Sequence, residues 1–545
     1  MHRVPFTIPC VAAALLAACA AGTAGAWEAP VAVSRSAEAV DGPYLAVNAA
    51  GDAVLAWGRY RSPTEEEGLP GEGVVEATVR TRAAQNWVPA TLTSPPEELA
   101  TRPVAGFDAT GGPVVAWTTM RRGVMDVTGG EATGGPTAWT TTAIDLPFPE
   151  PQAATMRASG SDGTIALAIK GAWPETALHV WMRAPGGGWS EAPSPPAEAS
   201  ETENLAIAVR DGRPVLAWLE ATPADRPQQA RTRLAISALD APGAAWGTPR
   251  RTPYRVGWAD GPQLLALTDG TLIAYWGTRA GNRQNTYSTL THPDGTQDPT
   301  VRLPAPGAVA PGPGGTAVWA QSTPLGPAVW IRSPQGAWSR AEGLAGAECI
   351  GGAGIASLAM GPSGEVVVVE TAGDMGDWGS SLRAWVRDAD GHWARPVWLS
   401  TTLAGGAVTA IDGAGRIHAA WWQQTRTGPA VRVTTTTAAT AGTMPGMREA
   451  LAGVSGLTVR AAGGRVTVRF RTSRPGTVQV TVTDMADAAS PTVPEVRFRG
   501  RTGLHVLPLT RGAARLARGR WRVRATPLAG FLSGCPVISR PFVVR

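Results

Sequence analysis

Residues 51–57 read GDAVLAW, a Gly-containing turn followed by a short apolar strand that ends in Trp. Related stretches are GGPVVAW at 111–117, GRPVLAW at 212–218 and GTLIAYW at 270–276. Such turns recur every 45 to 60 residues or so, which is the length of one four-stranded propeller blade. The turns are Gly51-Asp52, Gly111-Gly112, Asp162-Gly163, Asp211-Gly212, Asp269-Gly270, Gly314-Gly315, Ser363-Gly364 and Ala414-Gly415. The pattern predicts an all-β repeat protein in which each turn leads into an inner strand.

A second marker is a pair of Trp residues eight positions apart, with Gly and Pro or Asp between them. This arrangement is typical of two antiparallel strands joined by a short hairpin loop. It occurs at Trp181 and Trp189, Trp330 and Trp338, and Trp385 and Trp393.

The last strand of a blade is marked by a Trp that is followed by small residues and Pro. Residues 27–34, WEAPVAVS, have this pattern. Similar stretches follow Trp87, Trp189, Trp246 and Trp393, but the unit that begins near Trp421 runs into a Thr-rich tract without one. We therefore expect the N-terminal strand to complete the last blade, which removes an open sheet edge. The markers predict about eight blades, or seven if one unit is degenerate.

In its repeats, the chain resembles the secreted β-propellers of bacteria that are loosely grouped with BNR and sialidase-like proteins. The resemblance covers residues 27–435, and Ser161-Asp162-Gly163-Thr164 is a fragment of that group's Asp box, without its full spacing or aromatic residue. The resemblance implies a propeller fold. It assigns no activity, because one fold serves many functions.

The first 26 residues have the features of a secretory signal: Arg3, an apolar run, and small residues before Trp27. LAAC at 16–19 also resembles a lipobox, so acylation of Cys19 is the alternative to release of a soluble chain. No later segment is apolar enough to predict a transmembrane span. Cys349 and Cys535 remain after the signal, and an oxidising compartment allows them to form a disulfide.

After a linker at 436–453 the composition changes, and residues 454–545 predict a basic immunoglobulin-like or fibronectin-III-like β-sandwich. This region holds 16 Arg against Asp484, Asp487 and Glu495, a net charge of +13, whereas the whole chain is +5. Strands are expected at 464–472, 477–483, 495–501, 504–509, 520–526 and 539–545. The stretch resembles the C-terminal Ig-like modules of exported bacterial proteins.

The arginines of the sandwich have three interpretations. They form cationic rows for an anionic polymer or lipid headgroups, they are ordinary solvated residues in a chain whose only lysine is Lys170, or they dock the sandwich on the acidic propeller. The rows consist of Arg465, Arg469, Arg471, Arg520, Arg522 and Arg524.

No motif marks a catalytic residue, a cofactor or a metal site. The sequence has no His pair at zinc-ligand spacing, and Asp388-Ala389-Asp390-Gly391 is interpreted as a hairpin turn because the closing Glu of a calcium loop is replaced by Leu399. We expect a monomer that does not bind nucleic acid.

Most of the 22 Trp recur at equivalent strand positions, as packing between blades requires. Trp173, Trp378 and Trp422 depart from this pattern just beyond inner strands, and Trp258 precedes one, so these four are the candidate ligand-binding residues. The sequence favours a non-catalytic exported binding or scaffold protein, with a glycan, an envelope polymer or a surface protein as partner. The alternative is a sialidase-like, glycan-active hydrolase without recognisable motifs.

Overall fold

The structure is a computed structural model that describes most of the chain from Trp27 onward. The described residues are 27–35, 39–60, 73–84, 86–94, 99–120, 127–135, 138–144, 153–159, 163–170, 178–185, 187–195, 205–221, 231–241, 244–256, 258–280, 283–303, 307–323, 326–341, 354–372, 380–394, 396–436, 454–462, 465–472, 475–484, 496–508, 519–529, 532–533, 537–538 and 542–544.

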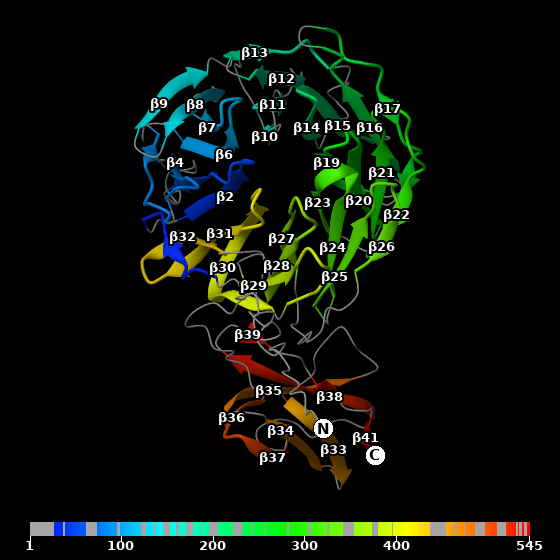
Figure 1. Cartoon of the computed structure of the whole chain (residues 1–545). Helices are drawn as coiled ribbons and strands as arrows, with labels where there is room; N and C mark the ends of the chain where they lie inside the picture. The colour runs from blue at the N-terminus through cyan, green and yellow to red at the C-terminus, as the bar shows by residue number, and fades with distance from the viewer. Residues whose placement is uncertain are drawn as a thin grey trace, which may run out of the picture.

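The described part of the chain consists of β-strands, turns and one short 3-10 segment, and its N-terminal part forms a ring of antiparallel sheets (Figure 1). The first three sheets have four strands each. They are β2(Ala39–Val47), β3(Ala53–Tyr60), β4(Gly73–Arg80) and β5(Leu92–Thr93); β6(Leu99–Phe107), β7(Pro113–Met120), β8(Val127–Gly135) and β9(Ala138–Ile144); and β10(Ala153–Ser159), β11(Ile165–Lys170), β12(Leu178–Arg183) and β13(Trp189–Glu191).

The next three sheets repeat this order, with one extra strand in the fourth. They are β14(Leu205–Arg210), β15(Arg213–Ala221), β16(Arg231–Ala238), β17(Arg250–Arg251) and β18(Arg255–Val256); β19(Trp258–Ala266), β20(Leu272–Ala280), β21(Arg283–Thr291) and β22(Val301–Leu303); and β23(Ala308–Pro311), η3(Pro313–Gly315), β24(Ala317–Thr323), β25(Gly326–Arg332) and β26(Trp338–Arg340).

The last sheet of the ring has seven strands in the order β27-β28-β29-β30-β31-β32-β1. Their bounds are β27(Ile355–Met360), β28(Val366–Ala372), β29(Ser380–Arg387), β30(Val397–Ile411), β31(Ile417–Thr425), β32(Gly428–Thr435) and β1(Val31–Ala32). The long β30 is the middle strand of this sheet. Its residues up to Ala404 pair with β29, and its residues from Ala404 onward pair with β31.

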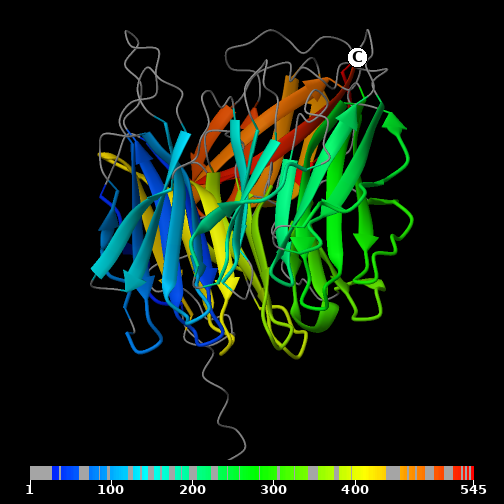
Figure 2. The ribbon, with the colours of Figure 1, turned by 90° about the horizontal axis from the view of Figure 1, so that it is seen from above.

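The innermost strands of these sheets contact one another in a closed cycle, β2-β6-β10-β14-β19-β23-β27-β30 and back to β2. Figure 2 shows the ring from its side, with strands running between its two ends. A closed cycle of four-stranded antiparallel sheets defines a β-propeller, so the prediction of an all-β propeller is confirmed.

The Gly-containing turns lie between the first and second strands of the sheets, so each turn leads into the strand that is second from the centre. Each turn holds a glycine with positive φ, for example Gly51 at +91° and Gly364 at +92°. Only glycine adopts this conformation without strain, which explains why the turns recur in the sequence.

The Trp pairs eight residues apart form hairpins of equal register. Trp189 pairs with Arg183, Trp338 with Arg332 and Trp393 with Arg387. The large Trp side chains fill the seams between sheets, and six of them are fully buried: Trp27, Trp57, Trp218, Trp276, Trp385 and Trp421. Most Trp at recurrent positions therefore pack the core, as expected.

The N-terminal strand completes the last sheet. Val31 pairs with Val433 and Ala32 with Arg432, and Trp27 forms a further bridge to Thr436. Backbone hydrogen bonds run from Glu28 N to Thr435 O (2.8 Å) and from Val33 N to Val431 O (3.0 Å). The outer edge of β32 is thus covered by a strand from the other end of the chain, which is the predicted pairing.

From Val454 onward the strands form two further sheets beside the ring (Figure 1). One holds β33(Val454–Ala462), β34(Arg465–Thr472) and β37(Gly503–Pro508). The other holds β36(Val496–Gly500), β35(Gly476–Asp484), β38(Gly519–Ala529), β39(Leu532–Ser533), β40(Val537–Ile538) and β41(Phe542–Val544).

The buried core of this unit joins Val466, Val468 and Phe470 of the first sheet to Val478, Val480, Val523 and Ala525 of the second. The sequence predicted strands close to β34 through β38 but missed β33, whose residues it left before the first strand. At the chain end it expected a strand over 539–545, and the described β41 lies within that range, with the short β40 before it.

No helix within the described ranges is long and apolar enough to cross a membrane.

Candidate functional site

The two ends of the ring differ in how the strands are connected. At one end, tight turns join the first strand to the second, as at Gly51, and in some sheets the third to the fourth, as at Gly391. At the other end, the second strand continues to the third and the fourth to the next sheet through mostly longer segments. Loops on a rigid scaffold are where binding residues usually lie, so this loop end is where the site is sought.

At the loop end, several innermost strands contain a bulge shortly after they begin. In β2 the pairing with β3 shifts between Asp41 and Tyr44, and the Tyr44 hydroxyl donates a hydrogen bond to Asp41 Oδ1 (3.3 Å). In β19 the pairing with β20 shifts between Asp260 and Gln263. Bulges are common beside binding sites because they redirect side chains.

The bulge of β19 places Gln263 opposite Tyr275, whose hydroxyl donates to Gln263 Oε1. Burial raises the pKa of Tyr275 far above its ordinary value, so the phenol stays protonated and remains a donor. Both bulges lie at an Asp-Gly-Pro sequence, at 41–43 and 260–262. This repeated tripeptide is the signal from which the sequence could have identified both places.

A third bulge, in β30 between Gly405 and Val408, brings Trp422 of β31 against the backbone of two glycines. A methyl group added to Gly405 would lie 2.6 Å from Cζ2 of Trp422. One added to Gly406, whose φ is +58°, would meet both Trp422 Cδ1 (2.9 Å) and the Gly42 carbonyl oxygen of β2.

These residues form one continuous group where the last inner strand meets the first. We call it the β2–β30 seam: Asp41 and Tyr44 of β2, Gly405 and Gly406 of β30, and Trp422 of β31. Trp422 is half-buried, as are Asp41 and Tyr44. Trp422 lies over glycines that also approach Gly42 of β2, and the neighbours of Gly42 include the Asp41 carboxylate and the Tyr44 phenol. The group combines an apolar surface with side chains that accept and donate hydrogen bonds.

Two of the four predicted Trp residues, Trp422 and Trp258, lie within the described ranges. Trp422 lies within β31 rather than beyond it, at the loop end as expected, and Trp258 is the first residue of β19, where only its backbone is described. Trp173 and Trp378 lie outside the described residues. The described residues next to each of these two segments are the end of one strand and the start of the next, β11 with β12 and β28 with β29, and these ends lie at the loop end.

Of the predicted arginines, Arg469 and Arg471 are exposed on β34 and alternate with buried Val468 and Phe470. The other four have described backbones only: Arg465 begins β34, while Arg520, Arg522 and Arg524 lie on β38 of the other sheet. The two rows therefore belong to different sheets. Cys19, Cys349 and Cys535 lie outside the described residues.

The carboxylates that the sequence did not single out are mostly structural. Four buried glutamates bind arginine side chains on other strands: Glu76, Glu131, Glu220 and Glu370. Glu131 joins two sheets, because it accepts hydrogen bonds from Arg183 Nε (2.8 Å) and Trp189 Nε1. None of these four pairs involves an innermost strand.

A buried polar network supports the place where the ring closes. His418 lies between Asp412 Oδ2 (3.3 Å) and Thr435 Oγ1 (3.2 Å). Burial opposes ionisation of Asp412, but hydrogen bonds from His418, Arg416 and the backbone outweigh it and hold its pKa well below the usual range. Burial lowers the pKa of His418, and the nearby Asp412 carboxylate offsets this only in part.

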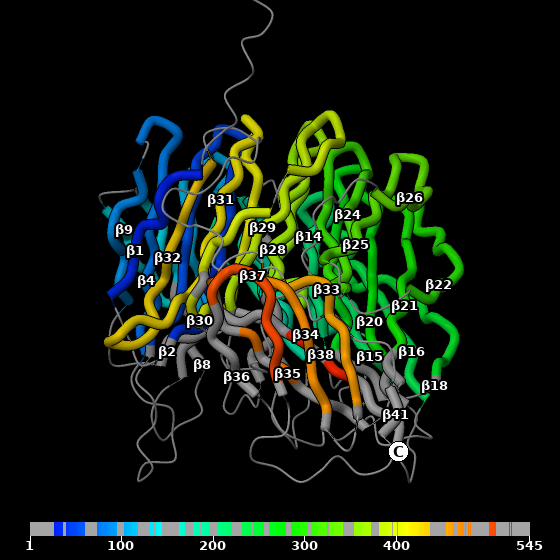
Figure 3. The backbone as a smooth tube through the Cα atoms, turned by 90° about the horizontal axis from the view of Figure 1, so that it is seen from below, coloured from blue at the N-terminus to red at the C-terminus, as the bar shows by residue number. Residues whose placement is uncertain are grey.

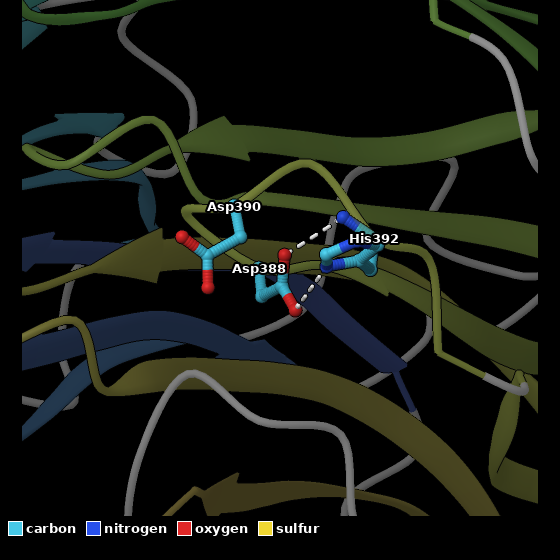
Figure 4. A group of neighbouring side chains, drawn as sticks. All are labelled: Asp388, Asp390 and His392. Atoms are coloured by element: carbon cyan, nitrogen blue, oxygen red, sulfur yellow. Dashed lines mark hydrogen bonds and ion pairs between the residues drawn. The ribbon is translucent and has the colours of Figure 1, made fainter.

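Within the described ranges, one cluster has the residue types of a metal site: Asp388, Asp390 and His392, whose ligand atoms lie within 4.8 Å of one another (Figure 4). They occupy a hairpin turn in which Gly391 N donates to Asp388 O (3.1 Å), so the hairpin interpretation is confirmed. The Asp388 carboxylate accepts the His392 N–H (2.7 Å) and thereby caps the turn, which accounts for its presence.

No protein-family model and no curated protein matches this sequence. Solved structures with a similar fold include a protein of unknown function from Dyadobacter fermentans (TM-score 0.36, 14% identity, covering 62% of this chain and 94% of that one). The β-propeller domain of the Trilobed protease from Pyrococcus furiosus has a TM-score of 0.37 at 12% identity over 62% of this chain and 93% of its own. The α-L-arabinofuranosidase Arb93A from Fusarium graminearum has a TM-score of 0.31 at 14% identity over 51% and 91%. Scores this low assign neither a blade number nor an activity to this chain.

Proposed function

We propose that the chain is an exported binding protein: an eight-bladed propeller followed by an Ig-like sandwich. The cycle of innermost strands supports eight blades, provided that the seven-stranded sheet is two blades that share the bent strand β30. Two facing sheets around one apolar core support the sandwich.

Export rests on residues 1–26, with cleavage before Trp27 as the expected outcome and acylation of Cys19 as the alternative. Mass spectrometry of the chain purified from its host distinguishes them by the mature N-terminus. The same experiment tests the disulfide between Cys349 and Cys535, because the linked peptides change mass on reduction.

The β2–β30 seam is the observation that carries the binding function. Trp422 is a half-buried indole at the loop end of the ring, over backbone that cannot accept larger residues at Gly405 and Gly406, and the adjoining strand β2 carries Asp41 and Tyr44. Sugars combine apolar ring faces with hydroxyl groups, and an aromatic face with adjacent hydrogen-bonding groups complements both. A glycan is therefore the ligand class that this group fits best.

The test is an array of glycans and cell-envelope polymers probed with residues 27–545 at low and high salt. Binding to one sugar class that survives high salt is the expected result. Trp422→Ala should weaken it about thirtyfold, since loss of an aromatic anchor costs about 2 kcal/mol. The matched control is Trp338→Ala, which removes a 37% exposed Trp from the outer strand β26.

Because Trp422 also packs on the backbone, each variant is first checked for an unchanged thermal transition. Tyr44→Phe and Asp41→Asn alter the seam with little change in volume and serve as second tests. Equal binding by all variants, or no sugar binding at all, contradicts the proposal and leaves a protein partner. Release of shorter sugars from a bound glycan would instead establish the hydrolase alternative.

A further inference from the structure

The sheet β33-β34-β37 has an outer face that differs from the rest of the described surface. Its inner face is apolar and buried, with Val466, Val468 and Phe470 at 3% exposure or less. The alternating residues Arg469 and Arg471 are exposed. In Figures 1 and 3 this sheet is on the side of the sandwich away from the ring.

The charge on this face has one sign. The three strands contain arginines but no Asp or Glu. Arg460, Arg469 and Arg471 are exposed, and none of them forms an ion pair with a carboxylate in the described ranges. Within these ranges the three cations are not used in ion pairs, and they can therefore accept an anion from outside.

Apolar side chains stand directly beside these cations. Leu504 is 45% and Val506 56% exposed, although both are large aliphatic residues. The strand register places Leu504 opposite Arg471 and Val506 opposite Arg469. The face therefore has two adjacent rows, one cationic on β34 and one aliphatic on the edge strand β37.

We propose that this face binds the surface of a membrane that contains anionic phospholipids. Arginine forms bidentate hydrogen bonds with phosphate groups, and aliphatic side chains gain free energy on entering the boundary between headgroups and acyl chains. A dissolved polyanion would use the arginines but leave Leu504 and Val506 in water. The face also lacks an aromatic platform for sugars or bases, since Phe470 is buried.

The test is sedimentation of the full mature chain with vesicles of phosphatidylcholine alone or mixed equally with phosphatidylglycerol. Binding only to the anionic vesicles is expected. Arg469→Gln with Arg471→Gln should weaken partition about thirtyfold, because each cation near an anionic leaflet contributes about fivefold. Leu504→Ser with Val506→Ser should also weaken it, and this loss should persist at high salt.

The matched control is Arg302→Gln with Arg426→Gln, which removes the same charge from exposed propeller positions. It should bind anionic vesicles like the wild type, and all variants should keep the wild-type thermal transition. Equal weakening by the control, or no effect of the aliphatic pair, overturns the proposal. Binding to polyphosphate without binding to vesicles would also overturn it, and would assign the face to a polymer.

Discussion

Replacing Glu370 by Ala should destabilise the ring more than any exposed substitution. Its carboxylate is fully buried and accepts hydrogen bonds from Arg383 Nη2 (3.1 Å), Trp385 Nε1 (3.1 Å) and Ser322 Oγ (3.2 Å). The last of these comes from the neighbouring sheet. Arg383 is itself 1% exposed and lies over the rings of Trp385 (4.5 Å) and Trp398 (5.6 Å).

Truncation of Glu370 leaves the Arg383 guanidinium buried without its counter-charge, which costs about 3–5 kcal/mol. The indole N–H and the Ser322 hydroxyl also lose their acceptor. Glu370→Gln keeps an acceptor oxygen and should cost less. Removing both charges, with Glu370→Met and Arg383→Met, should recover part of the loss, because the aromatic rings then contact aliphatic chains.

The assay is urea unfolding followed by Trp fluorescence, with the double-mutant cycle giving the coupling free energy between Glu370 and Arg383. Asp390→Ala is the control, since this exposed carboxylate should change stability by less than about 0.5 kcal/mol. A loss at Glu370→Ala no larger than the control, or a cycle without coupling, would refute the assigned role of the pair.

Acid should weaken ring closure through His418. The pKa of His418 is lowered in the folded chain, so the unfolded chain binds a proton first as the pH falls. The free energy of unfolding should therefore fall by up to about 1.4 kcal/mol per pH unit below about pH 6.5. His418→Gln should flatten this slope in urea midpoints measured between neutral and mildly acidic pH, while Asp412, whose pKa is lowered, affects only more acidic solutions. The turn glycines should differ in cost: Gly364→Ala meets no atom within 4 Å and carries only the positive-φ penalty of about 1 kcal/mol. Gly163→Ala, whose new methyl lies 2.6 Å from Ala109 N, should cost clearly more in thermal unfolding, and equal losses would contradict the described packing between the second and third sheets.

The regular features of the ring were predictable because they depend on local chemistry. A glycine with positive φ is needed at each tight turn, and the hairpin of Trp181 and Trp189 has its register fixed by its loop. Closure could be predicted because WEAPVAVS at 27–34 had no local partner and the unit after Trp421 lacked a last strand.

The seam was not predictable in the same way. Gly42 and Gly406 meet only because the ring closes, and no local pattern records a contact between residues so far apart in sequence. The buried pair of Glu370 and Arg383 was missed for a similar reason, since a charged residue in a strand is normally exposed. Trp422 was identified because it broke the repeat, but its packing over glycines required the structure.

The seam exists only if the N-terminal strand closes the ring, so the pairing of β1 with β32 is the central claim. Val33 N donates to Val431 O, which makes Ala32 and Arg432 a non-hydrogen-bonded pair with the short separation that a disulfide needs. In a chain with Ala32→Cys and Arg432→Cys, peptide mapping by mass spectrometry should find these two positions linked, whereas Ala32→Cys with Thr434→Cys should remain unlinked. Free cysteines in the first variant, or equal linking in both, would contradict the closed ring.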